Sequence, residues 1–235
     1  MTRTDKATAI SQGAHFDFER GEVLNINKPE NCTSFDVVKR IRALVAVKKV
    51  GHAGTLDPFA RGVLLICTGK ATKRVSDLVD CDKEYLATIE LGKVTDTLDR
   101  TGTIIRETVP PVFDRATILR VCNQFTGEIW QTPPMYSAIK IKGQRLYDLA
   151  RRGMVVDRKP RKVTIHHIEL LNFDSPRMEL RVTCSKGTYI RALAYDIGEE
   201  LGCGAHLNEL VRTRIGPYKL ENAFTLNRFE RLLAH

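Results

Sequence analysis

One carboxylate stands in a stretch of the chain whose composition would hold it still: Asp57, in the sequence GHAGTLDP from Gly51 to Pro58. Glycine permits tight backbone conformations that side chains would block. Pro58 fixes its own φ and disfavours helical geometry at the preceding residue, so we expect Asp57 to be extended. A carboxylate fixed in this way can serve as a nucleophile or a base. The alternative is that the Asp-Pro pair only begins a turn.

Positive charge is distributed unevenly along the chain. There are 37 basic and 28 acidic residues, a net charge of +9, and residues 140–162 alone hold nine basic and two acidic residues, a net charge of +7. Glycines and a proline in this segment predict a protruding loop, with a short helix at 144–152. Such a segment is typical of a surface that binds a phosphate backbone. The alternative, a solvated helix face with paired charges, is less favoured because few acidic residues are present. We expect the nucleic-acid backbone to be bound by Lys140, Arg145, Arg151, Arg152, Arg158 and Lys159.

Composition argues against several other classes of protein. No two of the six cysteines form a Cys-x-x-Cys pair, and the histidines have no companions at metal-ligand spacing, so no metal is predicted. The apolar run Val63–Cys67 is too short to span a bilayer, and the N-terminus lacks the apolar run of a signal peptide. We therefore expect a cytoplasmic protein.

Hydrophobic periodicity predicts the elements that must position these residues. In the N-terminal half the predictions are a strand at 23–26, a capping box at 33–36 that starts a helix, a buried strand or helix start at 62–69, and a strand at 85–91. In the C-terminal half they are a helix from Asp114 to Gly127, strands at 163–171 and 178–185, a helix capped by Thr188 and closed by Gly202, and a short helix from Ala205. Strands and helices are interspersed without a regular βαβ rhythm, which favours an α+β fold with a mixed sheet.

Four segments are more informative together than alone. They are GHAGTLDPFARG (51–62), KEYLATIELG (83–92), PPMYSAIK (133–140) and SKGTYIR (185–191), with NKP (27–29) before them and GCGAHLNELVRTRIG (202–216) after them. In this order and spacing the chain resembles the TruB family of tRNA pseudouridine synthases, from about Gly21 to the last few residues. The resemblance implies a mixed, largely antiparallel sheet with flanking helices, the pseudouridine synthase catalytic fold. It also implies that a uridine in the T-arm loop of tRNA, at position 55, is isomerised to pseudouridine without cofactor or metal.

The resemblance further implies roles for individual residues. In the family, the aspartate of the GTLDP loop is catalytic, which matches Asp57, and the arginine of SKGTYIR pairs with it, which matches Arg191. The tyrosine of the KEY strand stacks on the target base, which matches Tyr85, and this phenol is also a candidate base for the late proton on carbon. The loop histidine, here His52, enters the space that the flipped nucleotide leaves. The remaining residues expected at the substrate are Lys28, Pro29, Tyr189 and Leu210.

These residue types suit the reaction. A base inside a stack cannot be reached, so the nucleotide has to leave the stack before its glycosidic bond is broken. The detached base must then turn without escaping, which requires a close apolar pocket. The fork of an arginine would orient the carboxylate of Asp57, and a lysine could not reproduce that geometry. The microscopic role of the carboxylate stays open among attack on the sugar, attack on the base and removal of a sugar proton.

The predicted organisation is a flexible tail at 1–20 and a single catalytic domain at 21–235, with a basic RNA-binding insertion at about 133–162. Many relatives continue into a small RNA-binding module, often of the PUA type, so we expect a short form that relies on the insertion. The expected partner is a tRNA T-arm stem-loop, bound by a monomer without a guide RNA, an obligate protein partner or a membrane. Two alternatives stay open: an RNA chaperone that folds tRNA without chemistry, and a hydrolase of nucleosides.

Overall fold

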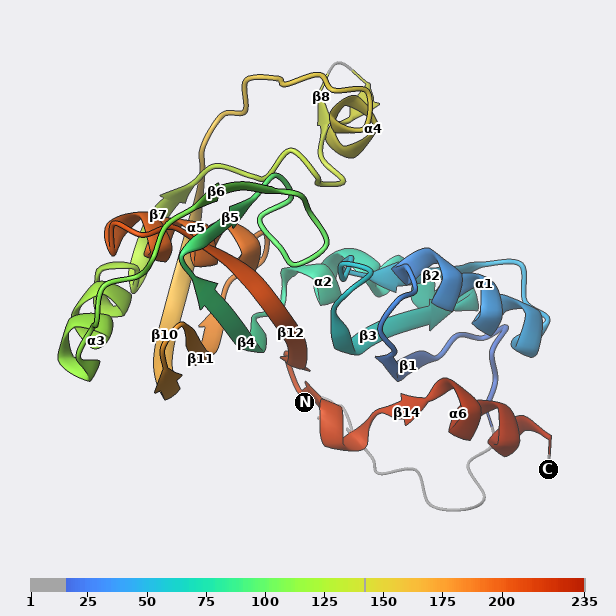
Figure 1. The fold of residues 1–235 in the computed structure, drawn as a ribbon. Helices are drawn as coiled ribbons and strands as arrows, with labels where there is room; N and C mark the ends of the chain where they lie inside the picture. Colours follow the sequence, from blue (N-terminus) through green and yellow to red (C-terminus); the bar gives the residue numbers. More distant parts are fainter. Residues whose placement is uncertain (1–15, 142, 235) are drawn as a thin grey trace. The chain divides into compact units, whose positions relative to one another are not determined.

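The computed structural model describes residues 16–141 and 143–234 (Figure 1). The chain divides into two compact units. The first unit contains the described residues up to Glu84 and those from Val211 onward, and the second contains Tyr85–Leu210. The second unit is thus inserted in the sequence of the first. The single catalytic domain at 21–235 stays a prediction.

The first unit is built around a short sheet. Strand β3 (Arg61–Thr68) pairs along its length with the antiparallel strand β1 (Val23–Lys28). On its other side β3 has two partners: antiparallel β2 (Val50–Ala53) near its end, and parallel β12 (Ala205–Ile215) at its start. The other elements of this unit are α1 (Ser34–Val45), η1 (Gly69–Arg74), α2 (Val75–Asp80), β13 (Tyr218–Lys219), η2 (Leu220–Asn222), β14 (Phe224–Thr225) and α6 (Leu226–Leu233).

The predicted start of α1 is confirmed. Thr33 is its N-cap, and its side-chain oxygen accepts a hydrogen bond from the Asp36 backbone N–H while the Asp36 carboxylate accepts one from the Thr33 N–H. This reciprocal pair satisfies two N–H groups that the first turn of a helix leaves without partners. The residues Val37, Val38 and Ile41 then fall on one buried face, as the periodicity predicted.

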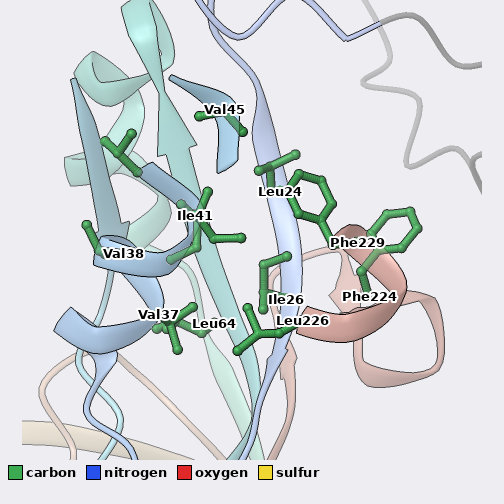
Figure 2. Packing of buried hydrophobic residues seen from close by; sticks show 12 residues of the cluster. Leu24, Ile26, Val37, Val38, Ile41, Val45, Leu64, Phe224, Leu226 and Phe229 are labelled. Atoms are coloured by element: carbon green, nitrogen blue, oxygen red, sulfur yellow. The ribbon is translucent and has the colours of Figure 1, made fainter. Parts of the chain in front are cut away.

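A hydrophobic core of the first unit contains residues from both the early and the late segment of this unit (Figure 2). Leu24 and Ile26 of β1 pack between residues of α1 on one side and Phe224 and Phe229 on the other. The short strand β14 is parallel to β1. Two residues within the expected tail at 1–20 also contribute, because Phe16 and Phe18 stack with their ring centroids 5.2 Å apart and pack against Phe229. The packed part of the chain therefore extends at least to Phe16, and residues 1–15 lie outside the described structure.

Gly62 is required where β3 meets β12. Its φ is +114°, and a Cβ at this position would collide with the backbone of Arg212, which pairs with it across the two strands. We expect Gly62→Ala to lower the free energy of unfolding by about 2–4 kcal/mol, because the strands must separate or distort to admit a methyl group. Urea unfolding measures this. The matched control is Gly51→Ala, where a Cβ would meet no atom within 4 Å. Equal losses in the two variants would contradict the prediction.

The second unit has a longer sheet. Its central pair is antiparallel β10 (Arg161–Asp174) and β11 (Arg177–Cys184), with β7 (Gly127–Gln131) antiparallel on the outer side of β10 and β4 (Lys83–Leu91) beside β11. The first part of β12 lies beside β4. The other elements are β5 (Lys93–Thr95), β6 (Ile104–Glu107), α3 (Arg115–Gln124), β8 (Lys140–Ile141), β9 (Gln144–Arg145), α4 (Leu146–Ala150) and α5 (Ile190–Glu200).

The predicted fold class is confirmed: helices accompany a sheet in which most described pairs are antiparallel and the pairs β1–β14 and β3–β12 are parallel. The strand predictions at 23–26, 85–91, 163–171 and 178–185 are confirmed, and the segment 62–69 forms a strand over most of its length. On β11 the alternate residues Met178, Leu180, Val182 and Cys184 are all buried, as expected for one face of a strand.

Two element predictions are wrong. Helix α5 begins at Ile190 with Tyr189 as its N-cap and no side-chain cap, whereas the Thr188 hydroxyl donates to the carbonyl of Ser185. The segment from Ala205 is strand β12 and not a helix. Its apolar residues Leu207, Leu210 and Val211 have helical spacing, but β12 has sheet partners on both sides, and short apolar runs do not distinguish a helix from such a strand.

The basic insertion forms a hairpin and a short helix. Strands β8 and β9 pair with each other, and α4 follows directly, within the range 144–152 predicted to be helical. Figure 1 shows these elements joined to the sheet of the second unit by two extended connections. The insertion thus contributes a projecting feature to this unit, as the glycines and proline predicted.

Candidate active site

Asp57 lies in the connection between β2 and β3. Residues 54–60 form this connection, and the Asp57 side chain is half-buried between the buried Leu56 and the exposed Pro58. The backbone N–H of Ala60 donates to the Asp57 carbonyl at 3.1 Å. The Asp-Pro pair therefore does begin a turn, and that turn helps to fix the carboxylate.

Every backbone carbonyl from residue 54 to residue 58 accepts a hydrogen bond. The Arg212 guanidinium donates to Gly54 and Thr55 at 3.1 and 3.3 Å. The Ser34 hydroxyl lies 3.1 Å from the Leu56 carbonyl and 2.9 Å from the Leu56 N–H, and Ala60 donates to Asp57. The last carbonyl, that of Pro58, accepts from the Asn31 N–H at 2.9 Å and from the Lys28 ammonium at 3.2 Å. A loop with this many anchors holds its side chains in one arrangement.

Lys28 is fully buried, with 0% of its surface exposed. Its ammonium donates to the carbonyls of Pro29, Cys32 and Pro58 at 2.8, 2.8 and 3.2 Å, which matches its three N–H groups. Burial lowers its pKa, with the nearby Cys32 and Asp57 acting in the opposite sense. The ammonium thus ties the turn after β1 to the Asp57 loop, and Pro29 beside it is exposed. The substrate contacts expected of Lys28 and Pro29 stay predictions.

His52 lies at the end of β2, five residues before Asp57, and is half-buried. Burial lowers its pKa, and the positive charge of Arg212 lowers it further. The imidazole is consequently neutral at pH 7, since even an unperturbed histidine is mostly neutral there. A neutral ring is a better insert among stacked bases than a hydrated cation, so the side chain suits the predicted wedge role, which is untested.

In the second unit, Arg191 occupies the first turn of α5 and is 3% exposed. It donates to the carbonyls of Thr97 at 2.9 Å and Tyr136 at 2.8 Å, and one of its terminal nitrogens lies 3.4 Å from a carboxylate oxygen of the equally buried Asp99. A basic residue in a first helical turn opposes the helix dipole, which favours an anionic partner nearby. Asp99 is such a partner. The pairing of Arg191 with Asp57 stays a prediction.

Asp99 is itself fixed by its neighbours. Its carboxylate accepts hydrogen bonds from the Thr97 hydroxyl at 2.9 Å and from the N–H and hydroxyl of Thr101 at 2.9 and 2.5 Å. Its backbone carbonyl accepts from the Thr95 hydroxyl at 2.7 Å. The connection between β5 and β6 is therefore a rigid loop that holds one side of the Arg191 guanidinium.

Three further predicted site residues lie in the second unit. Tyr85 is on β4 and is 8% exposed, and Leu210 is buried on β12. Tyr189 is half-buried, and its backbone N–H and carbonyl bond to the side-chain amide of Gln131 at 2.7 and 3.1 Å. The structure thus groups Lys28, Pro29, His52 and Asp57 in the first unit and the other four in the second.

Comparison with known proteins places this arrangement in a family. The family model "TruB family pseudouridylate synthase (N terminal domain)" matches residues 42–190, and "tRNA pseudouridylate synthase B C-terminal domain" matches residues 191–235. The chain belongs to the TruB family. Pseudouridine synthases are isomerases, and the chain is an enzyme of this class.

Individual TruB relatives agree with the family match. A protein of Clostridium tetani named tRNA pseudouridine synthase B is 52% identical over 87% of this chain and 71% of its own length. One of the same name from Opitutus terrae is 47% identical over 89% of this chain and 87% of its own length. A solved structure titled "Crystal Structure of a Cbf5-Nop10-Gar1 Complex" has 34% identity and a TM-score of 0.72, over 91% of this chain and 54% of that one. This chain thus spans about half the length of that structural relative.

Within this TruB chain, the residues predicted to bind the RNA backbone have different surroundings. Arg151, Arg152 and Lys159 are exposed, and the Arg151 guanidinium lies 5.5 Å from the centre of the Tyr147 ring. Arg158 is half-buried and donates to the Pro133 carbonyl at 3.1 Å. This hydrogen bond connects the segment after α4 to the segment before β8. Lys140 and Arg145 are backbone partners in the register of β8 and β9. The exposed residues are the ones that could reach phosphates.

Sequence reasoning missed three residues that organise the site: Ser34, Asp99 and Arg212. Ser34 was read only as part of a capping box. Asp99 lies in a stretch rich in threonine and aspartate, TDTLDRTGT, which could have signalled a side-chain-bonded turn. Arg212 would have been noticed if its segment had been read as a strand, because it then shares a buried face with Leu210.

No group of three or more histidine, cysteine or acidic side chains within residues 16–141 and 143–234 is arranged to hold a metal ion. In that same part of the chain, none of the helices is both long and apolar enough to cross a bilayer.

Helix α5 also carries a titratable group with a shifted pKa. Burial, and secondarily the charge of Glu199, raise the pKa of Asp196 to about 6. Because the folded protein holds this proton more tightly than the unfolded chain, stability contributed by the protonated form is lost as the pH rises from about 4 to 6. We expect Asp196→Asn to remove this fall and to stabilise the protein at pH 7 by on the order of 1 kcal/mol.

Urea unfolding at several pH values measures the effect of Asp196→Asn. The control is Glu200→Gln, which removes an exposed carboxylate from the same helix and should change stability by less than about 0.5 kcal/mol. A wild-type stability that stays constant from pH 4 to pH 7, or rises over that range equally in both variants, would contradict the prediction.

Proposed function

We propose that this chain isomerises a uridine in the T-arm loop of tRNA, at position 55, to pseudouridine. The TruB relatives named tRNA pseudouridine synthase B support tRNA as the substrate. The observation that carries the chemistry is the half-buried Asp57 carboxylate on a loop in which all carbonyls from 54 to 58 are hydrogen-bonded. A loop held so firmly is suited to one task, the presentation of its carboxylate in a fixed direction.

The reaction breaks the bond between N1 of uracil and C1′ of the ribose and forms a bond between C5 and C1′. The proton on C5 is released and N1 acquires one, so no atom is lost or gained overall. Asp57 is the catalytic carboxylate, acting as a nucleophile or a base. No oxidant, reductant or cofactor is needed for this balance.

Before the chemistry, the target nucleotide leaves the base stack, at a cost of a few kcal/mol. His52, neutral because its pKa is lowered by burial and by Arg212, occupies the vacated space. Tyr85 stacks on the flipped base, and Leu210 contributes an apolar wall that keeps the detached uracil in place. Arg191 orients the Asp57 carboxylate, with Tyr189 beside it. Lys28 and Pro29 complete the lining.

The direct test is tritium release from a T-arm stem-loop labelled at C5 of the target uridine only. The purified chain should release the label in proportion to pseudouridine formed, without added protein or guide RNA. A stem-loop labelled at a different uridine of the same loop is the control and should release none. Equal release from both substrates would reject position 55 as the target.

Two alternative functions give other results in the same assay. An RNA chaperone would bind and refold the stem-loop without releasing tritium. A nucleoside hydrolase would liberate free uracil that keeps the label at C5. Chromatography of the reaction products therefore separates the isomerase from both alternatives.

The exposed cations of the insertion are proposed to bind the RNA backbone. We expect the triple variant Arg151→Gln, Arg152→Gln, Lys159→Gln to bind the stem-loop more weakly. The salt dependence of its affinity should be shallower by about 2 to 3 in the slope of log K against log salt, since each lost phosphate contact removes slightly less than one unit.

Fluorescence anisotropy at several salt concentrations measures this slope. The charge-matched control neutralises three exposed lysines of the first unit, Lys39, Lys48 and Lys73. An equal loss of slope in both triple variants would indicate that only the net charge matters and that the insertion has no special role.

A further inference from the structure

Arg212 is a buried cation next to the Asp57 loop, where Lys28 is slightly more deeply buried. It lies on β12, it is 1% exposed, and it ranks among the largest fully buried side chains of the described structure. A guanidinium removed from water in this way is costly unless its N–H groups are hydrogen-bonded. The acceptors to which its N–H groups donate therefore indicate the structural role of the side chain.

The guanidinium joins the two ends of the β2–β3 connection. Its Nε donates to the carbonyl of Val63 on β3 at 2.7 Å, and its terminal nitrogens donate to Gly54 and Thr55, directly after β2. Strands β2 and β12 share one edge of β3, with β2 beside Leu65–Thr68 and β12 beside Arg61 and Gly62. The side chain of Arg212 consequently lies between the end of β2 and the start of β3, where the connection that carries Asp57 begins and ends.

The backbone is adapted to this placement. Gly62 has no side chain, and its lack of a Cβ lets the Arg212 backbone approach β3 closely enough to pair with it. Gly54 has a φ of +85°, and a Cβ there would lie 3.8 Å from a terminal nitrogen of Arg212. Both glycines of this segment that have a positive φ thus adjoin Arg212: Gly62 adjoins its backbone and Gly54 adjoins its guanidinium.

We propose that Arg212 is a positioning residue for catalysis, which fixes the direction of the Asp57 carboxylate by holding the carbonyls of Gly54, Thr55 and Val63. This inference rests on the proposed function. Arg212 acts through the loop backbone, not on the uridine. The planar fork of arginine is required because a single ammonium cannot reach acceptors on β3 and on the loop with the same geometry.

The test uses two substitutions of Arg212 in the full chain. Arg212→Lys keeps the charge and loses the fork, and Arg212→Met keeps most of the length and loses both. Arg214→Met is the matched control, two residues further on β12, where the side chain is 29% exposed and approaches Glu84 at 3.9 Å. Single-turnover tritium release, the dissociation constant for the stem-loop and amide hydrogen exchange are measured for each protein.

We expect the single-turnover rate to fall by about 100-fold in Arg212→Met and more than about tenfold in Arg212→Lys, as a displaced catalytic group would give. The dissociation constant should stay within about threefold, since the substitution removes no RNA contact. Exchange of the Leu56 amide, which donates to Ser34, should accelerate while core amides of β3 such as Ile66 stay protected. This combination distinguishes a loosened loop from general destabilisation.

Wild-type rates in folded Arg212→Lys and Arg212→Met would overturn the inference. A rate loss without faster exchange at Leu56 would also overturn it, because the loop would then be intact. If Arg212→Met does not fold, Arg212→Lys carries the test by itself. If the wild-type protein releases no tritium, the proposed function fails, and the exchange comparison still decides whether Arg212 fixes the loop.

Discussion

Replacement of Asp57 by asparagine is expected to reduce pseudouridine formation by at least about 10⁴-fold while leaving the affinity for the T-arm stem-loop within about threefold of wild type. The amide has nearly the same shape, so the hydrogen bonds made by the backbone of the loop persist. It cannot act as a nucleophile or a base of comparable strength. Binding without turnover is therefore the expected phenotype, measured by tritium release and anisotropy on the same preparation.

The control for this experiment is Asp77→Asn, which removes an exposed carboxylate from α2 in the same unit. It should leave both the rate and the affinity unchanged. Turnover by Asp57→Asn near that of Asp77→Asn would end the assignment of Asp57 as the catalytic residue. Freshly prepared protein and an early time point exclude slow deamidation as the source of a small residual rate.

The second large effect is expected at Arg191. Arg191→Met would leave the buried Asp99 carboxylate without its cation and the Thr97 and Tyr136 carbonyls without their donors. Breaking a buried ion pair by removing one partner costs about 3–5 kcal/mol, because a charge stays buried and uncompensated. We expect a loss of stability of this size in urea unfolding, together with a loss of activity.

Two comparisons make the Arg191 prediction specific. Arg181→Met breaks a pair with Glu169 in which both side chains are more than 40% exposed, and it should cost less than about 1 kcal/mol. The double variant Arg191→Met, Asp99→Asn should recover part of the loss, since the buried charge is gone. Equal effects of Arg191→Met and Arg181→Met would show that the buried pair has no special contribution.

Much of the fold followed from local patterns. Thr33 caps α1 because its hydroxyl and the Asp36 carboxylate can satisfy the first turn without help from distant residues. The alternating residues of β11 are buried because a strand exposes successive side chains to opposite faces. Elements whose pattern depends only on neighbouring residues could therefore be predicted from the sequence.

The remaining features depend on partners distant in the sequence. The helix predicted from Ala205 is a strand because β3 and β4 provide hydrogen bonds on both of its sides, and no local signal reports them. That error concealed Arg212, whose donors reach residues about 150 positions earlier. Likewise, the family resemblance predicted that Lys28 lies at the substrate, and only the packing shows three carbonyls around its ammonium.

Because the second unit is an insertion in the sequence of the first, translation completes the two units in a fixed order. A growing polypeptide that has reached Leu210 already contains every residue of the second unit. It still lacks the strand β14 that pairs with β1, the helix α6 whose Phe229 completes the core, and the guanidinium of Arg212. The loop that carries Asp57 is made early at the ribosome and receives the hydrogen-bond donors of Arg212 only after the second unit has been synthesised.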